Sequence, residues 1–197
     1  MTSAFLSRLR RLKRAQDGVA ALELALLLPV LILLLMGAFE VPRSVLIYQK
    51  VARTSSEIGD LVARQDVITP DQLTDLYQAA DEIMTPFTFK TYGTIIISSI
   101  TQADSTSAPV IAWQCSSDAT LLLSSKFGKV GDKPVLPTDF TVGAGSNVII
   151  AEVYYKYTPV FSQYVYGSKK MFSPATFYDS VFFRPRSATQ ISLNGKC

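Results

Sequence analysis

The sequence of 197 residues contains no histidine, and this absence excludes several chemistries at once. Histidine-based catalytic triads, histidine proton shuttles and histidine-ligated zinc sites all need an imidazole. Only two cysteines are present, too few for a four-thiolate metal site. The motifs of serine hydrolases, P-loop proteins and dinucleotide-binding enzymes are also missing. We therefore expect no enzyme activity, no metal and no cofactor, although two carboxylates brought together by the fold would suffice for a hydrolase.

The chain has no excess of positive charge outside the N-terminal segment. Residues 1–18 carry five basic side chains and one acidic one, so this leader has a net charge of +4 and the rest of the chain −1. A second basic group lies among aromatic residues near the C-terminus: Lys169, Lys170, Arg184 and Arg186. Because the chain after the leader is slightly acidic, we interpret this group as the solvated rim of a sheet rather than as a nucleic-acid or adhesive surface.

Residues 19–39 form a long apolar run directly after the basic leader, with Glu23 as the only charged residue. As a helix, this run would extend about 31 Å, the thickness of the hydrocarbon core of a bilayer. It has no polar stripe, so a transmembrane helix is predicted. The basic leader predicts a cytoplasmic N-terminus and an exported C-terminal part. A cleaved secretory signal is the nearest alternative, but its apolar region is shorter and ends in a small-residue cleavage site.

The junction between the leader and the apolar run reads DGVAALELALLLP from Asp17 to Pro29. A carboxylate inside an apolar span is a candidate functional residue, although at headgroup depth it can also reach water without any role. With Gly18 and the basic leader, Glu23 makes the junction similar to the class III signal of type IVb prepilins. More specifically, it resembles the TadE/TadG-like minor pilins, or pseudopilins, of the tight-adherence (Tad) pilus system.

The resemblance implies that a prepilin peptidase cleaves after Gly18, leaving Val19 as the first mature residue and Glu23 as the fifth. It also implies a bacterial inner-membrane protein with a periplasmic head, which packs with other pilins and the assembly platform to prime or cap pilus assembly. In such a bundle we expect Glu23 to pair with the Val19 ammonium of a neighbouring subunit. Leu24 stands where the family commonly has an aromatic residue. An uncleaved anchor whose head binds an extracytoplasmic partner is therefore the alternative.

Four segments are expected along the chain: a cytoplasmic leader (1–18), a transmembrane helix (19–39), a periplasmic helical segment (40–86) and a β-rich head (87–197). Pro29 lies inside the transmembrane helix, where neighbouring groups can satisfy the freed carbonyl, so we expect a kink and no break. Together these segments predict an α+β fold, in which a long N-terminal helix packs on a small, mostly antiparallel sheet, the lollipop layout of pilins.

The sequence marks further elements of the exported part. Pro42 is a candidate break before an amphipathic helix over 43–64, whose expected buried residues include Val45, Tyr48, Ile58 and Val62. A second helix is expected to begin at Thr69-Pro70 with a capping box and to end before Thr85-Pro86. Four β-rich runs predict strands: Thr94–Ile100, Val110–Cys115, Val148–Tyr157 and Thr176–Phe183. In the third run, odd-numbered residues from Ala151 to Tyr157 face one side and even-numbered residues from Glu152 to Thr158 the other.

The two cysteines, Cys115 and Cys197, belong to the part that is expected to be exported. In an oxidising compartment, a single disulfide between them is the simplest interpretation. Two free thiols, or a bond to a partner protein, are the alternatives.

Overall fold

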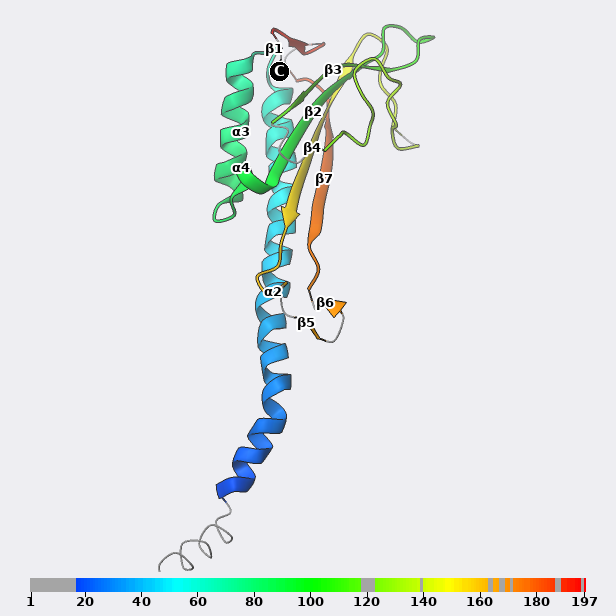
Figure 1. Ribbon diagram of the computed structural model, residues 1–197. Helices are drawn as coiled ribbons and strands as arrows, with labels where there is room; N and C mark the ends of the chain where they lie inside the picture. Colours follow the sequence, from blue (N-terminus) through cyan, green and yellow to red (C-terminus); the bar gives the residue numbers. More distant parts are fainter. Residues whose placement is uncertain are drawn as a thin grey trace, which may run out of the picture. The chain divides into compact units, whose positions relative to one another are not determined.

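The computed structural model describes residues 17–117, 123–138, 140–162, 165–166, 169–170, 172–186, 189–195 and 197. The chain divides into two compact units, Met1–Pro42 and Arg43–Cys197. We call the second unit, which includes the predicted β-rich segment 87–197, the head. Helix α2 (Asp17–Ala63) contributes residues to both units (Figure 1). All five basic residues of the predicted leader lie outside the described residues, so the structure gives no account of them.

In the first unit, the described chain consists of the apolar part of α2. Side chains 18–35 are exposed all around the helix. Within the described ranges, α2 is the one helix long and apolar enough to cross a membrane. Pro29 and Pro42 both lie inside α2 without ending it, so the helix does not break at Pro42. The predicted kink at Pro29 stays a prediction.

The second unit contains the remainder of α2, followed by α3 (Pro70–Met84) and the short α4 (Phe89–Tyr92). The predicted capping box starts α3: the Gln72 backbone N–H donates to Thr69 Oγ1 at 3.4 Å, and the Thr69 N–H donates to Gln72 Oε1 at 2.9 Å. Leu73, Leu76, Ala80 and Met84 form the buried face of α3, as expected from their helical spacing.

A four-stranded antiparallel sheet with strand order β3-β2-β4-β7 forms the centre of this unit. Its strands are β2 (Gly93–Thr101), β3 (Val110–Ser116), β4 (Asn147–Tyr157) and β7 (Ala175–Phe183). Two short pairs accompany it: parallel β1 (Val67–Ile68) with β8 (Ser192–Leu193), and antiparallel β5 (Val165–Tyr166) with β6 (Lys169–Lys170). The predicted α+β class and all four predicted strands are confirmed.

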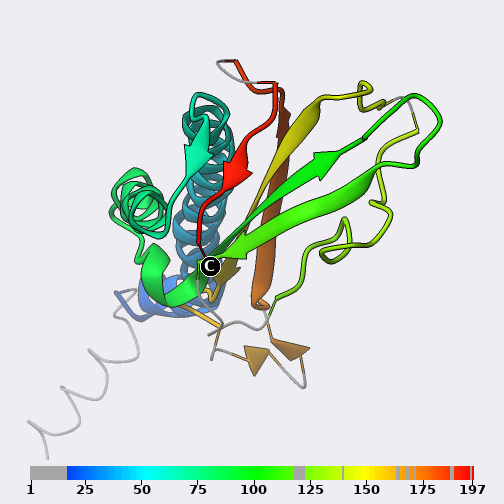
Figure 2. The ribbon, with the colours of Figure 1, turned by 90° about the horizontal axis from the view of Figure 1, so that it is seen from above.

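Both faces of the sheet are covered within the second unit. Figure 2 shows α2 and α3 against one face, where Ile97, Val153 and Tyr155 join the helices in the main core. Residues 123–138 and 140–142, which we call the cover segment, lie on the other face. There Phe127 and Val142 pack with strand residues in a second, smaller core. Strand β4 is therefore buried on both sides, apart from Lys156.

The buried face of α2 agrees with the prediction in its C-terminal half and differs in its N-terminal half. Ile58 and Val62 are completely buried, as predicted. Val45 and Tyr48 are 48% and 50% exposed, and Ile47 and Val51 are buried in their place. Both rows of residues satisfy the helical period and both are apolar, so the pattern alone could not select the row that meets the sheet. Tyr48 still contacts the sheet at its edge, where its ring lies 6.1 Å from that of Phe177.

Gly59 allows α2 to approach strand β7 closely. A Cβ atom at this position would lie 2.6 Å from Phe183 Cδ2 and 3.1 Å from Val181 Cγ2, closer than packed carbon atoms come. One turn earlier, the Ser55 hydroxyl donates a hydrogen bond to the Asp179 carboxylate on the same strand. The helix is thus held to β7 by apolar packing and by a polar contact.

Candidate functional site

The residues of the predicted processing site occupy the first turns of α2. Val19 and Glu23 are four residues apart, so they lie on the same side of the helix. Nothing lies within 4 Å of the position that a Cβ atom would take on Gly18, and Val19 is 56% exposed. The backbone around Gly18 is therefore sterically open on the side where a side chain would project.

Glu23 is exposed, and the structure records no hydrogen bond or ion pair for it among the described residues. Its side chain projects from a helix whose neighbouring side chains are leucine and alanine. A carboxylate in such surroundings is stable only if it reaches water or meets a positive charge from another molecule. Pairing of Glu23 with a second chain therefore remains a prediction.

The disulfide predicted between Cys115 and Cys197 is present, with a Cα–Cα distance of 5.3 Å. Cys115 lies in the main core, so the bond ties the C-terminal segment to β3. Two hydrogen bonds hold the same segment nearby: Trp113 Nε1 donates to the Ile191 carbonyl at 3.0 Å, and the Asn194 N–H donates to the Ile68 carbonyl at 2.8 Å. The described thiols are both paired, which excludes the free-thiol alternative.

A buried carboxylate, Glu152, lies on the sheet face beneath the cover segment. Its side chain is completely buried, and its Oε1 atom accepts hydrogen bonds from the Lys126 backbone N–H at 3.0 Å and the Tyr178 hydroxyl at 3.1 Å. The Tyr154 hydroxyl lies 3.3 Å from the same oxygen and 3.2 Å from the Ser124 carbonyl. Oε2 is buried without a hydrogen-bond partner.

The two tyrosines of this cluster stay protonated and serve as donors. Burial, with the charge of Glu152 nearby, raises the pKa of Tyr178 to about 12, and the same two causes raise the pKa of Tyr154. The Lys126 ammonium lies 3.4 Å from the centre of the Tyr178 ring, a cation–π contact that covers the cluster. These contacts fasten the start of the cover segment to β4 and β7.

This cluster was not predicted from the sequence, because the alternation in the strand placed Glu152 in a mostly polar row with Tyr154, Lys156 and Thr158. A signal was nevertheless present. Val148, Ile149 and Ile150 follow one another in β4, so both sides of the strand are apolar. A continuous apolar run is typical of a strand buried on both faces, and a charged residue within it is then buried as well.

The basic group near the C-terminus is only partly described. The side chains of Lys169 and Lys170 lie outside the described set. Arg186 forms an ion pair with Asp60 at 2.7 Å, and Arg184 Nη2 donates to the Thr141 carbonyl at 3.5 Å. Their neighbour Phe177 packs against the main core. The described members thus make structural contacts within the head.

Comparison with protein families finds a match along most of α2. Residues 18–59 match the family model described as TadE-like protein. The chain carries a TadE-like segment. The resemblance predicted from Gly18, Val19 and Glu23 is therefore confirmed. No curated protein and no solved structure matches the chain.

The TadE-like segment begins at Gly18 and extends along α2 to Gly59. It therefore includes the whole exposed apolar part of the helix and most of the part that packs on the sheet. This combination indicates a protein associated with the Tad pilus, and the apolar helix fits a membrane anchor. The head beyond Gly59, including the Glu152 cluster, lies outside the TadE-like segment.

Proposed function

We propose that this chain is a minor pilin, or pseudopilin, that contributes to priming or capping a Tad-type IVb pilus. In this proposal the chain acts by assembly and not by catalysis. A prepilin peptidase cleaves after Gly18 on the cytoplasmic side of the inner membrane, and the head lies in the periplasm. The observation that carries the proposal is the position of the TadE-like segment, which begins at Gly18 and contains Glu23 on an exposed apolar helix.

Cleavage would change the electrostatics of the helix start. It removes a leader of net charge +4 and creates an ammonium group at Val19. This positive charge then lies four residues from Glu23, on the same side of the helix. In a low-dielectric environment both charges need partners, and the opposite charges of neighbouring parallel helices meet when one helix is shifted along its axis by about 6 Å, the rise of four residues. The physical role of the pair is therefore to set the axial offset between neighbouring subunits.

Processing is tested by N-terminal sequencing of the protein extracted from membranes of a host that contains the Tad machinery. We expect the sequence to begin at Val19. Gly18→Val should leave the leader in place, because the valine side chain would occupy the open space beside the bond to be cleaved. Gly37→Val is the matched control, since both glycines are in the same helix and have open space around them. An intact leader in the unchanged protein would favour the uncleaved anchor.

Charge pairing is tested by Glu23→Gln, which keeps the size of the side chain and removes its charge. We expect at least a tenfold loss of co-purification with the other pilins from detergent extracts, since a neighbouring Val19 ammonium would lose its partner. Glu57→Gln is the control: Glu57 is also on α2 but forms an ion pair with Arg53 at 2.6 Å within the head. Equal recovery of partners with Glu23→Gln and with the unchanged protein would refute the pairing.

A further inference from the structure

Helix α2 presents an exposed apolar face beyond residue 39, where the predicted transmembrane segment ends. Within the head, the side chains of Val45, Leu46 and Tyr48 are each about half exposed. The first exposed charged side chain that follows them on α2 is that of Arg53. The apolar exposed part of the helix therefore continues to residue 48, a further rise of about 13 Å.

The two charged residues of this stretch, Glu40 and Arg43, are withdrawn from the exposed face. Glu40 is 2% exposed and lies seven residues before the buried Ile47, on the same side of the helix. Arg43 is partly buried, and its guanidinium lies 5.7 Å from the centre of the Phe87 ring. From Leu24 to Tyr48, where the structure describes every residue, α2 therefore has no fully exposed charged side chain.

The length of this uncharged face matches a lipid bilayer. A bilayer that ended at residue 39 would leave Val45 and Leu46 in water, which is unfavourable for apolar surface. As a straight helix, residues 24–48 would extend about 37 Å, more than the hydrocarbon core of about 30 Å and less than the whole bilayer of about 40–45 Å. Tyr48 would then lie at headgroup depth, where tyrosine is enriched because its ring is apolar and its hydroxyl polar.

The side chains of this face favour lipid over a partner helix. Helices that pack together in membranes have many small residues at their interfaces, because these let the backbones approach closely. The exposed positions of α2 between residues 39 and 48 include no glycine, alanine or serine. They are occupied by large or rigid side chains: Phe39, Val41, Pro42, Val45, Leu46 and Tyr48.

We propose that the periplasmic leaflet of the membrane covers this face as far as Tyr48, so that the first residues of the head are immersed in lipid. The inference rests on the proposed function in one respect, the membrane anchor. The head begins at Arg43, so its residues 43–48 lie within the leaflet. The head is thus held against the bilayer surface before assembly and does not stand above it on a free stalk.

The test introduces tryptophan at exposed positions of α2, one at a time: Leu28→Trp in the predicted span, Leu46→Trp in the proposed lipid contact and Leu61→Trp as the matched control near the end of the helix. All three leucines are exposed, so the fold should be retained. The full chain is reconstituted in phosphatidylcholine vesicles whose acyl chains carry bromine, which quenches tryptophan on contact. The native Trp113 lies in the head core, so the unchanged protein gives the background emission.

We expect Leu28→Trp and Leu46→Trp to lose about half or more of the added emission, because both would contact hydrocarbon, and Leu61→Trp to lose almost none. Quenching of Leu28→Trp without quenching of Leu46→Trp would overturn the inference and retain the anchor, leaving the face to water or to a partner protein. Absence of quenching in Leu28→Trp would refute the membrane anchor and this inference together. Equal quenching of all three variants would also overturn it, since the lipid contact would not end at Tyr48.

Discussion

Breaking the disulfide by Cys197→Ser is expected to lower the free energy of unfolding of the head by up to about 4.5 kcal/mol. The bond joins residues 82 positions apart, and a loop of this length restricts the unfolded chain by about that amount on the chain-entropy model. Cys197 is the residue to replace, since it is exposed, whereas serine at the buried position of Cys115 would add an unsatisfied hydroxyl to the core.

Urea unfolding of the full chain in detergent, followed by the fluorescence of Trp113, measures this change. Trp113 is the only tryptophan and is 9% exposed, so its emission reports the head core. Its indole N–H donates to Ile191 in the C-terminal segment, so local release of that segment should also shift the emission. The unchanged protein under reducing conditions is the control and should unfold with the variant. Identical midpoints for the oxidised and reduced protein would show that the bond adds no stability.

Glu152→Ala is expected to cost about 3 kcal/mol of unfolding free energy, because it leaves a cavity and removes the acceptor for buried donors. The Tyr154 hydroxyl retains the Ser124 carbonyl as an acceptor, whereas the Lys126 N–H and the Tyr178 hydroxyl lose theirs. Hydrogen exchange at the Lys126 amide should accelerate more than exchange in β2, because the cover segment loses its attachment to β4.

Glu152→Gln separates the loss of the acceptor from the loss of charge. Its amide keeps one acceptor oxygen, and its NH₂ group replaces Oε2, which has no partner to lose. We expect stability within about 1 kcal/mol of the unchanged protein, since removing a buried charge offsets the weaker hydrogen bonds. A loss as large as that of Glu152→Ala would show that the charge itself is required.

Local signals in the sequence were sufficient for the main helices and strands, whereas the processing site stays a prediction. The capping box of Thr69 and Gln72 acts over four residues, and the alternation from Ala151 to Tyr157 acts within one strand, so neither depends on distant parts of the chain. The same holds for Gly18, Val19 and Glu23, whose spacing is defined within one and a half helical turns. Their predicted roles depend on other proteins, the peptidase and the neighbouring pilins, and stay predictions.

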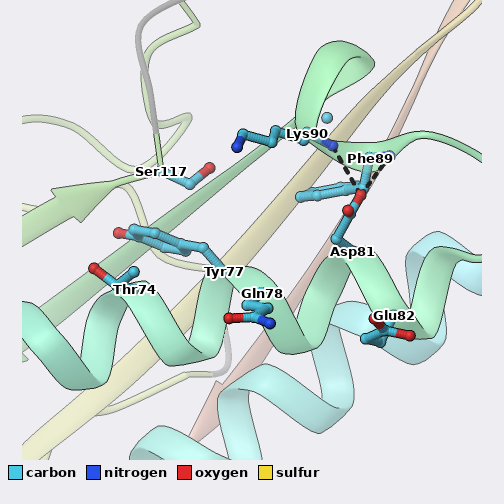
Figure 3. A pocket seen from close by; sticks show the side chains of 9 residues that line it. Thr74, Tyr77, Gln78, Asp81, Glu82, Phe89, Lys90 and Ser117 are labelled. Carbon is cyan, nitrogen blue, oxygen red and sulfur yellow. Dashed lines mark hydrogen bonds between the residues drawn. The ribbon is translucent and has the colours of Figure 1, made fainter.

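The remaining features depend on contacts between distant segments, which no local pattern specifies. The cover segment lies between β3 and β4 and contains two glycines and two prolines, yet its Phe127 and Val142 build the second core, and the backbone N–H of its Lys126 donates to the buried Glu152. Likewise, the attachment of α4 to α3 depends on the Asp81 carboxylate, which accepts hydrogen bonds from the backbone N–H groups of Phe89 and Lys90 (Figure 3). The choice between the Ile47 row and the Val45 row of α2 also depended on where the sheet lies.

The order of the strands has a consequence for how the head folds. Ser55 on α2 contacts Asp179 on β7, which lies 124 residues later in the chain. The middle of the sheet forms only when β2 pairs with β4, which comes after β3 in the sequence. Folding that depends on such long-range pairing is slow, since each closure costs loop entropy before it gains contacts. The apolar row of Ile47, Val51 and Ile58 therefore stays uncovered while the later strands are still being made. During that interval the chain is most vulnerable to aggregation and proteolysis, and other helices can compete for the same row.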